Sequence, residues 1–178
     1  HKDGKILASA SGDRTVKLWN VDTGDRLDTF PQPTLDQYTV AFSPDGRFVA
    51  AGGGDNRIRV WRLSDTAAEG TNEIIVARFA HEQPIVKLAY SPDGQTLLTA
   101  AEDRKVKLWQ ADTITERLLL EPQPDVAAAV SFSPDSALLA VGRLDGSLTV
   151  YNTAEGAVAP PAPPAKPELA TLSPRGIQ

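Results

Sequence analysis

Four copies of one module run through this sequence. In each copy, an aspartate stands six positions before an aromatic residue and ten positions after another aspartate. These three positions hold Asp3, Asp13 and Trp19 in the first copy, Asp45, Asp55 and Trp61 in the second, Asp93, Asp103 and Trp109 in the third, and Asp135, Asp145 and Tyr151 in the fourth. A repeat of about 40 residues is typical of architectures in which one unit cannot bury its own faces and stacks on its neighbours. The repeat therefore predicts a row of similar, stacked units.

Each module reads as short strands separated by turns. In the second module, apolar and β-branched residues fill 38–42, 47–53, 58–62 and 74–79, and the turn sequence SPDG occupies 43–46. Proline presets the backbone of such a turn, aspartate caps it and glycine tolerates a positive φ. The corresponding segments are 85–90, 95–101, 106–110 and 117–121 in the third module, 126–132, 137–142 and 147–152 in the fourth, and 5–11, 16–20 and 26–30 in the first.

Four short antiparallel strands per unit are typical of one blade of a β-propeller. The predicted fold class is therefore all-β, with about four propeller blades at 1–30, 38–79, 85–121 and 126–156. The first module lacks its opening strand, and the fourth lacks a clear closing strand because Pro160 and the residues after it cannot pair in a ladder. We expect the first and last blades to be incomplete, and the chain to form an arc with two open edges instead of a ring.

Composition excludes some classes of function. The 178 residues carry a net charge of −5 and have a sequence pI near 5.0. Nucleic acids and anionic membranes attract basic surfaces, so we expect neither as a partner. No apolar run is long enough to cross a bilayer, so membrane insertion is not expected. The absence of cysteine excludes disulfides and thiolate metal sites.

The SPDG turns, the turn aspartates and the aromatic residues six positions later resemble the WD-repeat β-propeller family over about residues 1–156. The Trp-Asp pair that names the family is absent, because the four modules read Trp19-Asn20, Trp61-Arg62, Trp109-Gln110 and Tyr151-Asn152. The resemblance implies a non-catalytic scaffold or a platform for protein–protein interaction.

The resemblance also implies a buried hydrogen-bond set within a blade, made by a histidine, a serine or threonine, the turn aspartate and the tryptophan. The third module matches at His81, Thr99, Asp103 and Trp109; the first keeps Ser9, Asp13 and Trp19; the second has Asp55 and Trp61 with Ala50 at the hydroxyl position; the fourth has Asp145 and Tyr151 with Ala140 at that position. We expect the set to satisfy buried polar groups.

His81, Thr99 and Asp103 are also the residue types of a nucleophilic triad. A threonine in the middle of a strand, without a strained elbow around it, is poorly placed to reach a substrate. The only imidazoles are those of His1 and His81, so a metal site is not expected. The glycine-rich GGGD at 52–55 precedes no helix that could cradle a phosphate. We therefore predict no catalytic activity and no cofactor in this segment.

Partner-binding positions follow from the resemblance. Propellers of this family mostly bind proteins at one mouth of the central channel, with residues at the start of the first strand and just before the turn aspartate. These positions hold Asp36, Tyr38 and Gly54 in the second blade, Pro84, Val86 and Glu102 in the third, and Val126, Ala128 and Leu144 in the fourth. Tyr38 is the favoured contact because aromatic residues anchor interfaces. The patch is acidic and apolar, which suits a basic or apolar peptide segment of unknown identity.

The sequence changes character after Gly156. Residues 157–178 contain six of the fourteen prolines, which predicts an extended linker and the possible start of a following domain. This tail resembles linkers that follow propellers in large bacterial multidomain proteins, often exported ones. The chain has no methionine and begins inside a repeat, so we interpret it as a partial propeller from a longer protein. The alternative function is a propeller attached to a catalytic or redox module, for example a c-type cytochrome or a hydrolase, outside this segment.

Overall fold

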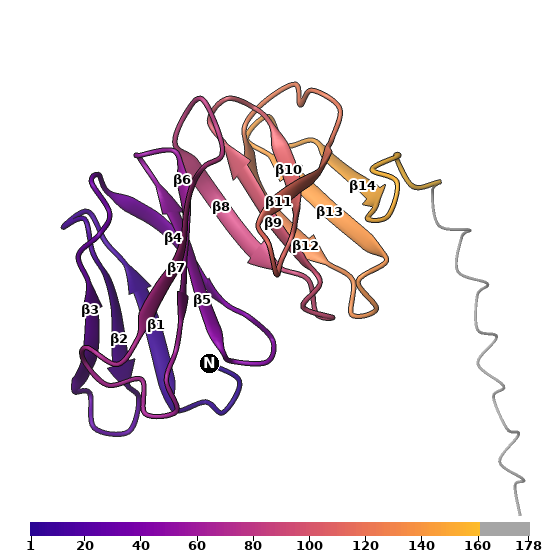
Figure 1. Cartoon of the computed structure of the whole chain (residues 1–178). Coiled ribbons are helices and arrows are strands. Elements are labelled where there is room, and N and C mark those ends of the chain that lie inside the picture. Colours follow the sequence, from indigo (N-terminus) through magenta and orange to yellow (C-terminus); the bar gives the residue numbers. More distant parts are fainter. Residues whose placement is uncertain (161–178) are drawn as a thin grey trace, which may run out of the picture.

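The computed structural model describes residues 1–160, which form fourteen strands in four antiparallel sheets and contain no helix (Figure 1). The first sheet contains β1 (Ile6–Ala10), β2 (Val16–Asn20) and β3 (Arg26–Phe30); the second contains β4 (Gln37–Phe42), β5 (Phe48–Gly53), β6 (Arg57–Arg62) and β7 (Glu73–Phe79); the third contains β8 (Ile85–Tyr90), β9 (Thr96–Ala101), β10 (Val106–Gln110) and β11 (Thr115–Leu119); the fourth contains β12 (Ala127–Phe132), β13 (Leu138–Arg143) and β14 (Leu148–Asn152).

Within every sheet, strands that are consecutive in the sequence are hydrogen-bonded neighbours. The sheets follow one another in chain order, and Figure 1 shows them fanned from the indigo first sheet to the yellow-orange fourth. The opening strands β4, β8 and β12 lie beside one another, which places the start of each sheet on the inner side of the fan. The sheets do not close into a ring. The prediction of an all-β chain with incomplete first and last units is confirmed, since the first and fourth sheets have three strands each.

The SPDG turns are held by their own side chains. In the second sheet, the Ser43 hydroxyl donates to Asp45, and Asp45 in turn accepts a hydrogen bond from the amide of Arg47 at 3.0 Å. The same bonds recur at Ser91 and Ser133. Burial alone would raise the pKa of Asp45, but these donors and the Arg47 guanidinium lower it to about 2. The turn that joins the first two strands of each sheet is thus fixed by residues that the sequence pattern repeats.

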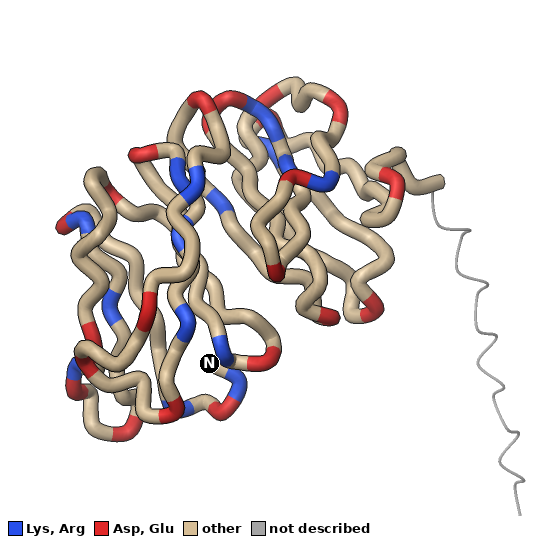
Figure 2. The backbone as a smooth tube through the Cα atoms, viewed as in Figure 1, with Lys and Arg blue, Asp and Glu red and all other residues tan. Residues whose placement is uncertain are grey.

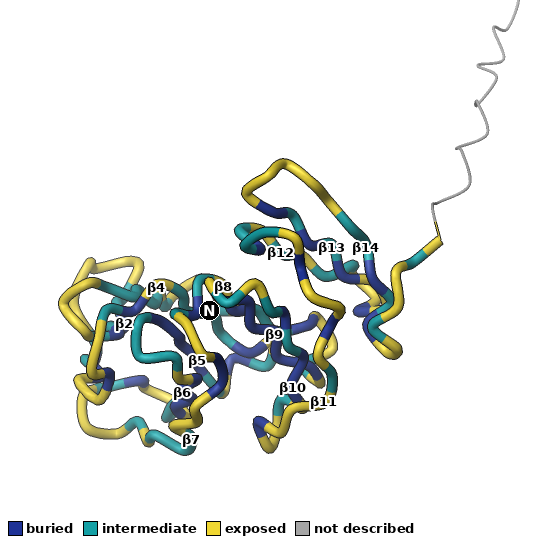
Figure 3. Tube along the Cα trace, turned by 90° about the horizontal axis from the view of Figure 1, so that it is seen from above, coloured by how far each residue is buried: buried dark blue, intermediate teal, exposed yellow. Residues whose placement is uncertain are grey.

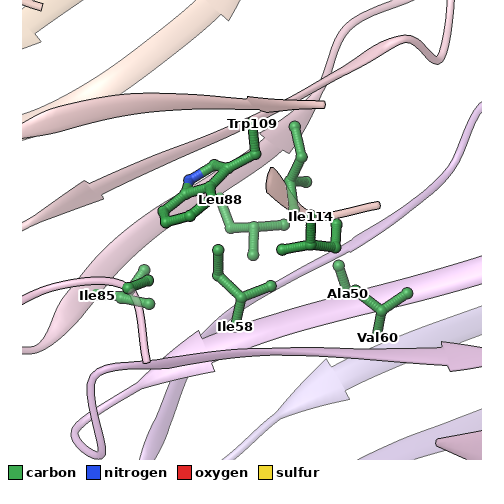
Figure 4. Packing of buried hydrophobic residues seen from close by; sticks show 9 residues of the cluster. Ala50, Ile58, Val60, Ile85, Leu88, Trp109 and Ile114 are labelled. Carbon is green, nitrogen blue, oxygen red and sulfur yellow. The ribbon is translucent and has the colours of Figure 1, made fainter. Parts of the chain in front are cut away.

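Apolar side chains fill three layers, one between each pair of adjacent sheets. Figure 4 shows the layer between the second and third sheets, where Ile58 and Val60 face Trp109 and Leu88. In the view from above, the buried residues follow the strands and the exposed residues follow the connecting loops (Figure 3). The side chains of an inner strand therefore pack on both of its faces, because a sheet lies on either side.

The end of the fourth sheet corrects one boundary. Residues 157–159, which the sequence assigned to the linker, pair with β14 through a bridge between Tyr151 and Val158 and through a bond from the amide of Ala159 to the carbonyl of Val150 at 2.8 Å. These three residues precede Pro160 and keep their amide donors, so they can join a ladder. The remaining tail, residues 161–178, lies outside the described residues.

Candidate functional site

The third sheet assembles four of the predicted residues into one buried network. Asp103 accepts from Nδ1 of His81 at 3.1 Å, and Nε2 of His81 lies 2.8 Å from the Thr99 hydroxyl. The indole of Trp109 donates to the same hydroxyl at 2.8 Å. His81 is 2% exposed and Thr99 is fully buried. The network joins the loop before β8 to β9, β10 and the turn between them.

The protonation of His81 follows from these contacts. A carboxylate only accepts, so Nδ1 of His81 carries the proton that faces Asp103, and Nε2 of the neutral ring accepts from Thr99. Burial lowers the pKa of His81, while the charge of Asp103 opposes this shift without reversing it. The ring is therefore neutral in the folded protein near neutral pH.

Asp103, His81 and Thr99 lie in the order of a nucleophilic triad, yet the surroundings suit a structural role. The Thr99 hydroxyl is fully buried and already bonds both the imidazole and the Trp109 indole. A nucleophile needs open space beside it for a substrate carbonyl or phosphoryl group. The arrangement satisfies buried polar atoms, and it offers no approach to the hydroxyl.

The first sheet keeps a smaller version of the network. The indole of Trp19 donates to the Ser9 hydroxyl at 2.8 Å. Asp13 does not join them; it accepts from the amide of Thr15 at 3.0 Å and pairs with Lys17. These bonds hold the pKa of Asp13 well below its usual range, with the contact to Lys17 contributing most.

The second sheet replaces the histidine with other donors. Asp55 accepts from the amide of Thr34 at 3.1 Å and forms an ion pair of 2.6 Å with Arg59, whose side chain is 4% exposed. Burial would raise the pKa of Asp55, but the Thr34 amide and the Arg59 charge lower it overall. The Trp61 indole donates to the side chain of Gln32 at 3.2 Å. Asp55 and Trp61 thus use separate partners.

The fourth sheet is organised around a buried arginine. The guanidinium of Arg143 donates to Gln123 at 2.8 Å, to the Tyr151 hydroxyl at 2.9 Å and to Thr149 at 3.0 Å. Asp145 remains in its own turn and accepts from the amide of Ser147 at 2.8 Å. Tyr151 takes the position of the tryptophan, and Arg143 takes over the central role that His81 has in the third sheet.

Sequence reasoning missed the two glutamines and Arg143. Gln123 precedes Asp145 by the same 22 positions that separate His81 from Asp103, and its amide lies 3.2 Å from the Tyr151 hydroxyl. Gln32 performs the same task for Trp61. Both glutamines lie in the tripeptide Pro-Gln-Pro, at 31–33 and 122–124, and this repeated tripeptide was the signal that could have identified them.

The strand register corrects two positions of the predicted network. Ser9 pairs with Lys17 and Thr99 pairs with Lys107, and each hydroxyl residue precedes its turn aspartate by four positions. Arg59 and Thr149 hold the position that Lys17 and Lys107 have, four residues after the turn aspartate, and they pair with Ala51 and Val141. Ala51 and Val141 therefore occupy the hydroxyl position, where Ala50 and Ala140 were expected. Ala50 and Ala140 lie one residue earlier and therefore face the opposite side of the sheet.

The residues predicted to bind a partner lie at one end of each sheet. A backbone hydrogen bond joins the two predicted positions in three sheets: Gly54 to Asp36 at 2.8 Å, Glu102 to Pro84 at 3.0 Å, and Leu144 to Val126 at 3.1 Å. We call this surface, formed by the loops before the first strands and the turns of Asp55, Asp103 and Asp145, the loop face. Tyr38 lies at this end of the second sheet and is 52% exposed.

The loop face contains an open hollow between the third and fourth sheets. Its volume is about 590 Å³, and it is lined by Val86, Lys87, Glu102, Val126, Ala128 and Leu144. Five of these are predicted positions, and Lys87 is the addition. Leu144 is 68% exposed. The hollow thus brings together predicted positions of the third and fourth blades. Asp36 and Tyr38 of the second blade, and Pro84 of the third, do not line it.

Charged residues of both signs are interspersed along the chain and include many in the loops (Figure 2). Within residues 1–160, no group of three histidine or acidic side chains is arranged to hold a metal ion. The described part of the chain also has no helix of the length and apolarity that would cross a membrane.

Comparison with known proteins agrees with this architecture. The family model for the WD domain, G-beta repeat, matches residues 1–20, 24–62, 74–110 and 123–152. Among solved structures, the crystal structure of the computationally designed Ika8 protein superposes with a TM-score of 0.73 and is 25% identical in sequence. The superposition covers 86% of this chain and 45% of Ika8, so the chain spans less than half the length of that protein.

The four matched repeats cover most of the sequence. The second and third of them each begin with the last strand of the preceding sheet, β3 or β7, and continue through the first three strands of the next sheet. The chain therefore belongs to the WD40 repeat family, and its four sheets are propeller blades.

Proposed function

We propose that this chain is a non-catalytic platform that binds a protein or peptide segment on its loop face, with the hollow between the third and fourth blades as the principal contact. The observation that carries the proposal is the hollow itself, in which the predicted positions Val86, Val126 and Leu144 converge. An exposed leucine at the rim of an apolar hollow is typical of a binding surface.

The chemistry of the hollow indicates the kind of segment that would fit. Val86, Ala128 and Leu144 offer apolar contacts, Glu102 is the acidic group of the lining and Lys87 is its basic group. The chain as a whole carries a net charge of −5. An apolar side chain next to a lysine or arginine would match both features, because the cation could pair with Glu102 while the apolar side chain leaves water.

Selection from a random peptide library displayed on phage tests this proposal. Peptides selected on the immobilised chain are expected to combine leucine, isoleucine or phenylalanine with an adjacent basic residue. Their binding should be lost in Val86→Glu and in Leu144→Glu, which place a charge in the hollow.

Leu119→Glu is the matched control, because Leu119 lies on β11, outside the hollow, and is 48% exposed. This variant should bind the selected peptides as the original chain does. Binding that survives both substitutions in the hollow, or a library that yields no binder, would contradict the proposal.

A further inference from the structure

A second open groove lies between the second and third blades, at the end of the sheets opposite the loop face. Gln37 pairs with Gly53 at the loop face, whereas Phe42 pairs with Val49 beside the SPDG turn at the other end. We call this other end the turn face and its groove, with a volume of about 490 Å³, the turn groove. Its lining includes Asp45 and Arg47 of the second blade and Tyr90, Asp93, Ala111 and Asp112 of the third. Both blades are four-stranded sheets, so the groove is enclosed by complete units.

The other two junctions are more closed on the turn face. Between the first and second blades, Nε2 of His1 donates to a carbonyl of the second blade at 3.0 Å, and the remaining hollow is about 200 Å³. Between the third and fourth, the Ser136 hydroxyl accepts from an amide of the third blade at 3.0 Å, and the remaining hollow is about 280 Å³. In the turn groove, Ser43 holds the position of His1 and Gly94 holds that of Ser136. These smaller residues leave the groove open.

Tyr90 brings a hydroxyl to the turn groove at a position where two other blades have none. Phe42 and Phe132 are the equivalent residues of the second and fourth blades. Burial raises the pKa of Tyr90 above its ordinary value, and the charge of Asp45 raises it further. No hydrogen bond contributes to this shift, and in the described part of the chain the hydroxyl has no partner. A tyrosine hydroxyl that is largely buried usually has one, so this group is free to bond a ligand.

The lining of the turn groove is acidic. Arg47 forms an ion pair of 2.6 Å with Asp45, so these two charges cancel. Within residues 1–160, neither Asp93 nor Asp112 forms an ion pair. Asp112 is exposed on the loop that follows β10. The groove therefore presents two negative charges that no cation of the described chain neutralises.

Asp93 is ionised and keeps acceptor capacity. Its Oδ1 accepts both bonds of its turn, from the Ser91 hydroxyl and from the amide of Gln95 at 3.0 Å, and Oδ2 takes part in neither. The Ser91 hydroxyl contributes most to lowering the pKa of Asp93, and the charge of Arg117 in the next junction lowers it further. The carboxylate is thus charged at neutral pH and can accept from a donor in the groove.

We propose that the turn groove binds an arginine side chain of a protein or peptide partner, with the guanidinium bonded to Asp93, Asp112 and the Tyr90 hydroxyl. A guanidinium has five N–H donors and no acceptor, so it suits acceptors that come from different elements. Its methylene groups pack against Ala111 and the Tyr90 ring, as long basic side chains do on apolar surface. Because the turn face and the loop face are at opposite ends of the sheets, the chain can hold two partners at once.

An NMR titration of the ¹⁵N-labelled full chain with the peptide acetyl-Ala-Arg-Ala-amide tests the proposal. The amides of Asp93, Gly94 and Asp112 are expected to shift and to saturate, and acetyl-Ala-Lys-Ala-amide should shift them less. Asp112→Ala should raise the Kd about fivefold through the lost charge. Tyr90→Phe should raise it about threefold through the lost hydroxyl. Both substitutions suit the fold, because other blades have alanine or phenylalanine at these positions.

Asp22→Ala is the matched control, since Asp22 is the equivalent exposed residue of the first blade and lies outside the groove. It removes the same charge and should leave the Kd unchanged. Thermal unfolding of each variant establishes that the sheets remain folded. Absence of shifts at the turn groove, equal shifts with the lysine peptide, or a Kd that Asp22→Ala raises as much as Asp112→Ala would overturn the proposal. Shifts at Val126 and Leu144 report on the hollow of the loop face in the same spectra, so the two proposals can fail separately.

Discussion

At the scale of single residues, Thr99 is the centre of the buried network in the third blade. Replacing it by valine keeps the shape and removes the hydroxyl, which leaves the Trp109 indole and Nε2 of His81 without a partner. Each buried polar group without a hydrogen bond costs about 1–3 kcal/mol, and the substitution leaves two such groups, so we expect Thr99→Val to lower the free energy of unfolding by at least about 2 kcal/mol. Urea unfolding followed by tryptophan fluorescence measures the loss.

Ser9→Ala in the first blade is the control for Thr99→Val. It removes the same kind of bond to Trp19, but Trp19 is only half-buried, and water can replace the hydroxyl there. The expected loss is below about 1 kcal/mol. Equal losses for the two substitutions would show that burial of the network does not determine its contribution.

His81 gives the stability of the chain a dependence on pH. Its pKa is lowered from 6.5 by burial, so below that value the unfolded chain binds a proton that the folded chain excludes. The neutral ring makes its full contribution to the free energy of unfolding above about pH 6.5. This contribution is lost as the pH falls from there toward the pKa of His81 in the folded chain. The urea midpoint should therefore decrease between about pH 7.5 and pH 5.5.

The variant His81→Gln tests the assignment of this effect. Glutamine holds the equivalent position in the fourth blade as Gln123, so the substitution suits the fold and removes the titrating group. The decrease of the midpoint over the same pH interval should become smaller in this variant. A slope that is unchanged would assign the effect to other groups.

At the scale of elements, the turns that join the first two strands of each sheet illustrate how a repeat tolerates variation. Ser136 stands where Gly46 and Gly94 stand in other blades, and it has a φ of 62°. Its hydroxyl accepts from the amide of Asp93 in the preceding blade at 3.0 Å. The hydrogen bond between blades thus offsets the unfavourable backbone conformation of Ser136.

Two substitutions at Ser136 separate these contributions. Ser136→Ala keeps the left-handed backbone and loses the bond, so we expect a loss of about 1 kcal/mol in unfolding free energy. Ser136→Gly loses the bond but relieves about 1 kcal/mol of backbone strain, so its effect should be close to zero. Thermal unfolding of both variants makes the comparison, and a more destabilised glycine variant would contradict this account.

The elements themselves were readable from the sequence because strand pattern and turn residues repeat. Segments such as 58–62 and 85–90 alternate side chains between two buried faces, and SPDG fixes the turn between them. The ends of strands were less accurate: the closing strand of the third sheet is Thr115–Leu119, although the apolar residues predicted 117–121. Apolar residues mark burial, whereas a strand ends where its hydrogen bonds end.

The polar interior was only partly predictable. His81, Thr99 and Trp109 could be recognised because their residue types and spacing match a pattern. Gln32 lies outside the strand pattern, and only the repeated tripeptide Pro-Gln-Pro pointed to it. Arg143 could not be recognised, because it takes the role of the histidine from a different position in the repeat. The hydroxyl position was misplaced by one residue in two blades, and in a strand a shift of one residue exchanges the two faces.

At the scale of the whole molecule, stability should be distributed unevenly along the row of blades. In repeat architectures each unit contacts only its neighbours, so an inner blade has two junctions and an end blade has one. The second and third blades have four strands each and bury residues on both faces, while β1 has an unpaired edge. The end blades should therefore open more often than the inner ones.

Hydrogen exchange of backbone amides measures this gradient. Amides of β5, β6, β9 and β10 should exchange slowest, and those of β1 and β14 fastest, with β14 slowed where Val150 bonds to Ala159. Uniform protection across the four blades would contradict this expectation. It would show that the junctions couple the end blades to the inner blades so strongly that the row unfolds as one cooperative unit.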